Sequence, residues 1–207
     1  MKIDIVDHPL ARHLVTHLRD ARTKPALFRT IAHHLTTLVA LEATKNLKTR
    51  PKTIETPLET LESDVLAESL VVVPILRAGL GMLDPILDLF PDVSVGYIGL
   101  ARDHTTAIAS SYYCKLPPLA GRAILVVDPM LATGGSAIQA IDEIKREGGE
   151  NVVLLCIVAA PEGVEAVNAA HPDVPIVSAA LDRELNDKKY ILPGLGDFGD
   201  RLYGTMA

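Results

Sequence analysis

Short apolar runs alternate along the chain with segments whose apolar residues recur every three or four positions. The first pattern is typical of buried strands and the second of amphipathic helices. Strands are predicted at residues 3–6, 70–74, 93–101, 124–127, 152–160 and 174–180. Helices are predicted after Pro9, at 25–45, up to about Phe90, from Ser136 onward and at 161–170. Because the two kinds of element alternate, we expect an α/β fold with a parallel sheet covered on both faces.

Three stretches follow neither pattern. Residues 48–59 contain two prolines and are predicted to form an exposed strand or arm. Residues 102–118 are polar and end in two prolines, which indicates a loop or flexible hairpin, and the tail at 181–207 is rich in glycine and proline. A chain of 207 residues suits one domain. We expect that domain to comprise an N-terminal helical arm of about 1–60, a core of about 65–180 and the tail.

The junction at 124–136 carries the strongest chemical signal. Its predicted strand is β-branched at three of four positions and ends at Asp128, after which Thr-Gly-Gly-Ser at 133–136 leads into a predicted helix. Free N–H groups and the dipole at a helix N-terminus attract an anion, and glycines let the backbone approach a phosphate. Asp128 is placed to accept hydrogen bonds from a polyol such as ribose. The junction therefore predicts a site for a sugar phosphate.

A tight turn with Ser136 as an ordinary N-cap is the alternative interpretation of this junction. The two common nucleotide-binding loops do not help to decide, because neither Gly-x-x-x-x-Gly-Lys nor Gly-x-Gly-x-x-Gly occurs here.

Composition excludes several classes of protein. A formal net charge of -6 argues against a general nucleic-acid binder, and 4% aromatic residues without Trp argue against a base-stacking platform. Cys114 and Cys156 are too few for a disulfide framework or a zinc site. The first residues lack an apolar signal region, and no apolar run reaches transmembrane length. We therefore expect a cytoplasmic protein that does not bind membranes.

Four motifs resemble those of uracil phosphoribosyltransferases. They read VPILRAGLGM at 73–82, DPMLATGGS at 128–136, VAAPEG at 158–163 and YILPGLGDFGDR at 190–201. The likeness runs over nearly the whole length. It implies an α/β fold like that of type I phosphoribosyltransferases, with a parallel sheet flanked by helices, a flexible hairpin and a small C-terminal hood that binds the base.

The resemblance implies a reaction in which uracil and 5-phosphoribosyl 1-diphosphate give UMP and pyrophosphate, with Mg²⁺ carried by the diphosphate rather than by protein ligands. It assigns catalytic roles to Arg77, Arg102, Asp128 and Asp197. The two arginines would bind the pyrophosphate and Asp128 the ribose hydroxyls. The residues assigned to the phosphoribosyl diphosphate as a whole are Arg77, Arg102, Asp128, Pro129, Met130, Leu131, Ala132, Thr133, Gly134, Gly135, Ser136 and Asp197.

The tail is assigned to base recognition. Uracil would be bound, largely through backbone groups, by Ile191, Gly196, Asp197 and Phe198. Glu184 and Phe198 differ from the residues common in the family and lie near the expected base pocket. The stretch after Arg102 lacks the family's prolines, which predicts a more mobile loop.

The resemblance also implies a homodimer or larger homo-oligomer, with GTP as a candidate effector. Two other functions remain open: a non-catalytic regulator of the same fold that senses nucleotides, and a phosphoribosyltransferase for another base. The negative net charge of the chain argues against binding of RNA by such a regulator. The tail at 196–201 favours uracil over a purine by resemblance.

Overall fold

A computed structural model describes residues 2–102 and 109–205, with the backbone alone described at 101–102 and 109–111. Within these residues a nine-stranded sheet forms the centre of the molecule. The main path of the sheet runs β1 (Asp4–Ile5), β11 (Ile176–Leu181), β10 (Asn151–Ala159), β8 (Ala123–Val127), β4 (Leu70–Leu76), β6 (Tyr97–Arg102), β7 (Ala109–Lys115). In addition, β5 (Ser94–Val95) pairs with β4, and β9 (Met130–Leu131) pairs with β10. Neighbouring strands are parallel, except that β6 and β7 are antiparallel at one edge.

Successive residues of the central strands point to opposite faces of the sheet and enter two separate cores. In β4, Val71 and Val73 pack into one core, whereas Val72 packs into the other. The residues of β8 divide in the same way. Both faces are therefore apolar, which explains why the buried strands read as continuous apolar runs in the sequence.

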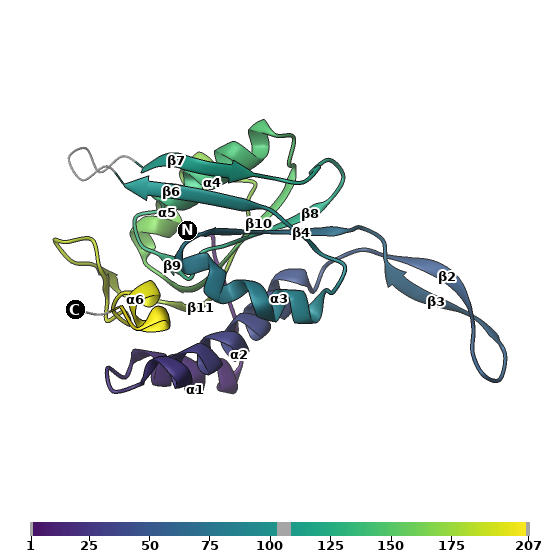
Figure 1. Cartoon of the computed structure of the whole chain (residues 1–207), viewed down its shortest axis with the longest axis horizontal. Helices are drawn as coiled ribbons and strands as arrows, with labels where there is room; N and C mark the ends of the chain where they lie inside the picture. Colours follow the sequence, from purple (N-terminus) through teal and green to yellow (C-terminus); the bar gives the residue numbers. More distant parts are fainter. Residues whose placement is uncertain (1, 103–108, 206–207) are drawn as a thin grey trace.

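Helices cover both faces of the sheet (Figure 1). On one face lie α4 (Gly135–Arg146) and α5 (Pro161–Ala170). On the other lie α1 (Pro9–Arg19), α2 (Pro25–Thr44), α3 (Leu83–Leu89) and the short α6 (Phe198–Tyr203). The predicted helices are confirmed with small shifts at their ends. Among the described helices, none combines the length and the apolar character needed to cross a membrane.

Two parts of the chain are more regular than the sequence pattern predicts. The arm predicted at 48–59 is a hairpin of β2 (Thr49–Glu55) and β3 (Thr60–Leu66), which projects from one end of the molecule (Figure 1). Its side chains are exposed at nearly every position, so β3 has no buried face that would mark it in the sequence. The tail contains the strand pair β12 (Glu184–Leu185) and β13 (Ile191–Leu192) as well as α6. These elements are too short to produce a periodic signal.

The carboxyl ends of three adjacent parallel strands meet at one edge of the sheet. β4 ends at Leu76, β6 at Arg102 and β8 at Val127. In parallel sheets, ligands bind beyond this edge. The tail with α6 lies at the same end of the molecule, opposite the projecting β2–β3 hairpin (Figure 1). The fold therefore starts the three predicted loops, at Arg77, after β6 and at Asp128, from a common edge.

Candidate active site

The segment that leaves β8 is fixed along β10 before it reaches α4. The N–H of Asp128 donates to Leu155 O at 3.1 Å, and Pro129 O accepts two N–H groups of β10 at 3.0 Å each. β9 then pairs with β10, and the N–H of Ala160 donates to Leu131 O at 2.8 Å. Buried Pro129 and Leu131 thus anchor the loop, while Asp128 at its start is half-buried.

The start of α4 is open to a ligand. Gly134 is the N-cap, and its φ of 83° lies in the left-handed region that favours glycine. No side chain caps the helix, so the alternative with Ser136 as an N-cap is wrong. Four successive N–H groups have no acceptor within the described chain: those of Thr133, Gly134, Gly135 and Ser136. An unfilled N-terminus of a twelve-residue helix is suited to bind a phosphate.

The Arg77 loop lies next to the end of β8. Arg77 follows β4 directly and begins a short 3-10 helix (Ala78–Met82). Its exposed guanidinium has no hydrogen bond or ion pair to any residue that the structure describes. A Cβ on Gly79 would lie 2.5 Å from Val127 O, so only glycine lets this loop pass so close to the end of β8. The close approach places the Arg77 loop next to the one that begins at Asp128.

Arg102 is the last residue of β6, and its backbone pairs with Ala109 of β7. This antiparallel pairing confirms a hairpin where a loop or hairpin is predicted. The side chain of Arg102 and the stretch at 103–108, where the mobile loop is predicted, lie outside the described residues. The assignment of Arg102 to pyrophosphate therefore stays a prediction.

The predicted base-binding residues lie close together in the chain but differ in exposure. Ile191 is buried in β13, whereas Gly196, with a φ of 81°, and Asp197 are exposed. The Asp197 carboxylate caps α6 by accepting the N–H of Asp200 at 2.8 Å. Glu184 is exposed in β12.

The side chain of Phe198 lies in the apolar core. It is buried edge-on against Phe28, with ring centroids 5.1 Å apart. The Arg201 guanidinium lies 4.6 Å from the centroid of the same Phe28 ring. The Phe198 side chain thus belongs to the core, and only its backbone is left for a ligand.

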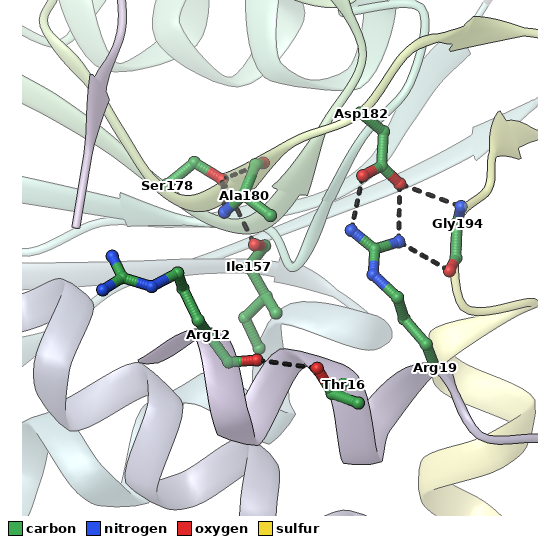
Figure 2. Close-up of polar contacts among 8 residues, drawn as sticks. All are labelled: Arg12, Thr16, Arg19, Ile157, Ser178, Ala180, Asp182 and Gly194. Carbon is green, nitrogen blue, oxygen red and sulfur yellow. Dashed lines mark hydrogen bonds and ion pairs between the residues drawn. The ribbon is translucent and has the colours of Figure 1, made fainter. Parts of the chain in front are cut away.

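Two arginines that sequence reasoning left without a role fix the tail. Arg201 is buried, which lowers the pKa of its guanidinium, and it donates to Leu195 O at 2.7 Å and to Asp20 O at 2.6 Å. Arg19 of α1 pairs with Asp182 and contacts Gly194 (Figure 2). The sequence carries no signal for the pair of Arg19 and Asp182, because the two residues are far apart in the chain and belong to no common motif.

The structure superposes on solved phosphoribosyltransferases. It matches a hypoxanthine phosphoribosyltransferase from Staphylococcus aureus with a TM-score of 0.54 and 10% identity over 76% of each chain. At that identity the likeness concerns the fold alone, and this fold is that of a phosphoribosyltransferase. The structure also matches that of the AQ2163 protein from Aquifex aeolicus, with a TM-score of 0.95 and 36% identity over 100% of both chains. The expected fold class is confirmed.

Sequence comparison narrows this class to one family. The family model described as Uracil phosphoribosyltransferase matches residues 5–205. The chain is 50% identical over 205 residues to a uracil phosphoribosyltransferase of Mesorhizobium japonicum, covering 98% of both chains. It is 52% identical over 206 residues to one of Geobacillus sp., covering 99% of both. The chain belongs to the uracil phosphoribosyltransferase family, as its motifs predict.

Proposed function

We propose that this enzyme transfers the 5-phosphoribosyl group of 5-phosphoribosyl 1-diphosphate to N1 of uracil, giving UMP and pyrophosphate in pyrimidine salvage. Membership of the family supports this reaction. The structural observation that carries it is the row of four N–H groups at 133–136 that have no acceptor among the described residues, close to Asp128 and the Arg77 loop. These three groups would bind the 5-phosphate, the ribose and the leaving diphosphate of one substrate.

Each group has a proposed part in the reaction. The N–H groups at 133–136 bind the 5-phosphate, and the Asp128 carboxylate accepts hydrogen bonds from ribose hydroxyls. As the bond from C1 to pyrophosphate breaks, negative charge grows on the leaving group. Arg77 and Arg102, which are always protonated, stabilise that charge with multidentate hydrogen bonds.

The tail is proposed to receive the base. Backbone groups at Ile191, Gly196 and Phe198 would match the two carbonyl acceptors and the N3 donor of uracil. The exposed Asp197 would contact the phosphoribosyl group and accept the N1 proton. Its carboxylate already accepts one hydrogen bond from Asp200, which holds it at the start of α6.

Magnesium fits this site as a companion of the substrate. Mg²⁺ prefers few carboxylates together with phosphate oxygens and water. In the part of the chain that the structure describes, no three His, Cys, Asp or Glu side chains gather to form a metal site. A diphosphate and ribose hydroxyls bound beside Asp128 would supply the oxygen donors that the ion prefers. When bound, Mg²⁺ would neutralise charge on the leaving diphosphate.

A homodimer or larger homo-oligomer is also proposed. A two-stranded hairpin alone is marginally stable in water. Nevertheless β2 and β3 project from the molecule (Figure 1). Their side chains are exposed at nearly every position. A second copy packed against the hairpin would stabilise it.

GTP as an effector and a cytoplasmic location are further proposals, and both rest on the family resemblance.

A spectrophotometric assay with Mg²⁺, phosphoribosyl diphosphate and a panel of bases tests the proposed reaction. We expect turnover with uracil and none with hypoxanthine, guanine or adenine. Turnover with a purine only would identify a phosphoribosyltransferase for another base. No turnover with any base would identify a nucleotide-sensing regulator and refute the proposal.

A further inference from the structure

A buried ion pair outside the sequence motifs joins α1 to the chain that leaves β11 (Figure 2). Arg19, the last residue of α1, forms a bidentate pair with Asp182: Nη1 lies 2.8 Å from Oδ2, and Nη2 lies 2.5 Å from Oδ1. The side chain of Asp182 is 3% exposed and that of Arg19 is 23% exposed. The fork geometry fixes the orientation of both side chains.

The same pair binds both backbone groups of Gly194. The N–H of Gly194 donates to Asp182 Oδ2 at 2.8 Å, and its carbonyl accepts from Arg19 Nη1 at 2.8 Å (Figure 2). Gly194 has a φ of 62°, and a Cβ there would lie 2.2 Å from Ile191 O. The next carbonyl, of Leu195, accepts from Arg201 at 2.7 Å. Two successive carbonyls are thus held by two guanidiniums immediately before Gly196.

We propose that Arg19 and Asp182 position the backbone of 194–198 for recognition of the base, an inference that rests on the proposed uracil transfer. An irregular, glycine-rich loop would otherwise lose conformational entropy when it binds uracil. A loop already held in its binding conformation avoids that cost. Asp182 and Arg19 are positioning residues, because they act on the base through the backbone of Gly194.

The geometry favours this role over simple stabilisation. Burying a carboxylate and a guanidinium costs desolvation free energy that offsets much of their attraction, so a buried pair is weak evidence for stability. Both members also bind Gly194, two residues before the exposed Gly196. The pair therefore controls where the following backbone groups lie.

Two variants and a matched control test the inference. Arg19→Lys keeps the charge but loses the fork, and Asp182→Asn keeps the shape but places an amide against Arg19. Arg12→Lys, on the same helix, is the control and changes an arginine whose exposed partner is Asp7 at 2.7 Å.

KM for uracil, KM for phosphoribosyl diphosphate, kcat and Tm are measured for each variant. We expect Arg19→Lys and Asp182→Asn to raise KM for uracil by about tenfold or more. KM for phosphoribosyl diphosphate should rise much less, because only Asp197 of the positioned stretch is assigned to that substrate and the pair does not contact the start of α4.

The outcomes separate this inference from the reaction on which it rests. If the parent protein and Arg12→Lys turn over uracil but Arg19→Lys shows the parent KM for it, the inference fails and the reaction stands. Equal rises in both KM values would indicate general loosening of the fold and would also overturn it. If Asp182→Asn fails to fold, the KM of Arg19→Lys for uracil alone tests the inference. A parent protein without uracil turnover refutes the proposed reaction itself and the inference with it.

Discussion

Gly163 of α5 packs so tightly against Ala132 that a Cβ at position 163 would lie 2.4 Å from the Ala132 carbonyl oxygen. Gly134 has the reciprocal relationship, since its Cβ would lie 2.9 Å from Gly163 O. Two backbones thus touch where the proposed phosphate-binding segment enters α4. The VAAPEG motif at 158–163 therefore contributes to the site by packing, because its glycine sets the position of 132–136.

Gly163→Ala should displace this segment. We expect the free energy of unfolding to fall by about 1–3 kcal/mol, the usual cost of overpacking, and KM for phosphoribosyl diphosphate to rise. Gly148→Ala is the control: its φ is 84° and nothing lies within 4 Å of an added Cβ. That variant should lose about 1 kcal/mol through backbone strain alone, with KM unchanged. An unchanged KM in Gly163→Ala would contradict the packing role.

Arg77→Lys should impair catalysis without affecting stability. The guanidinium makes no hydrogen bond or ion pair to a described residue, so the substitution removes no such interaction there. Lysine cannot reproduce the planar fork, and we expect kcat/KM to fall by about tenfold or more, or about 1.4 kcal/mol of transition-state stabilisation. Arg146→Lys, at an exposed pair with Glu143, is the matched control. Steady-state kinetics at parent level for Arg77→Lys would exclude the proposed contact with pyrophosphate.

Asp128→Asn should weaken binding of phosphoribosyl diphosphate. Replacing a charged acceptor with a neutral amide should cost about 1.5–3 kcal/mol, the range for hydrogen bonds to charged groups. Isothermal titration calorimetry in the presence of Mg²⁺ measures this loss without turnover. A Kd equal to that of the parent protein would remove Asp128 from the ribose site.

Glu162 should make stability depend on pH. Its Oε1 accepts the N–H of Leu185 at 2.8 Å, and this hydrogen bond is the main reason why the pKa of Glu162 lies below its usual 4.5. A carboxylate with a lowered pKa in the folded state stabilises the fold above the unfolded pKa. That contribution is lost as the pH falls through the folded value.

Glu162→Gln should therefore be less stable than the parent protein at pH 7, and the difference should close as the pH falls below about 4.5. Urea unfolding at several pH values measures it. Glu165→Gln, at an exposed position of the same helix, should match the parent protein throughout. A difference for Glu162→Gln that is constant with pH would contradict the assigned hydrogen bond.

The strand and the helix on either side of the candidate phosphate site could be predicted, because each leaves a local pattern in the sequence. The apolar run before Asp128 and the amphipathic segment after Gly135 each leave a periodic pattern. A ligand site between them follows from the geometry of strand and helix ends. The structure adds that the N-cap is Gly134 and that Gly79 brings the Arg77 loop against β8.

Contacts between distant residues could not be predicted in this way. Arg19 and Asp182 lie 163 positions apart, and neither occurs in a motif. Phe28 and Phe198 likewise come from distant parts of the chain, and only the fold brings their rings together. Such pairs form only when α1, α2 and the tail pack together, and no periodicity along one segment records that packing.

A crystal structure with phosphoribosyl diphosphate and Mg²⁺ tests the central claim most directly. We expect the 5-phosphate within hydrogen-bond distance of the N–H groups at 133–136, with the ribose hydroxyls at Asp128 and the diphosphate toward Arg77. A 5-phosphate bound elsewhere, with the start of α4 left open, would contradict the account.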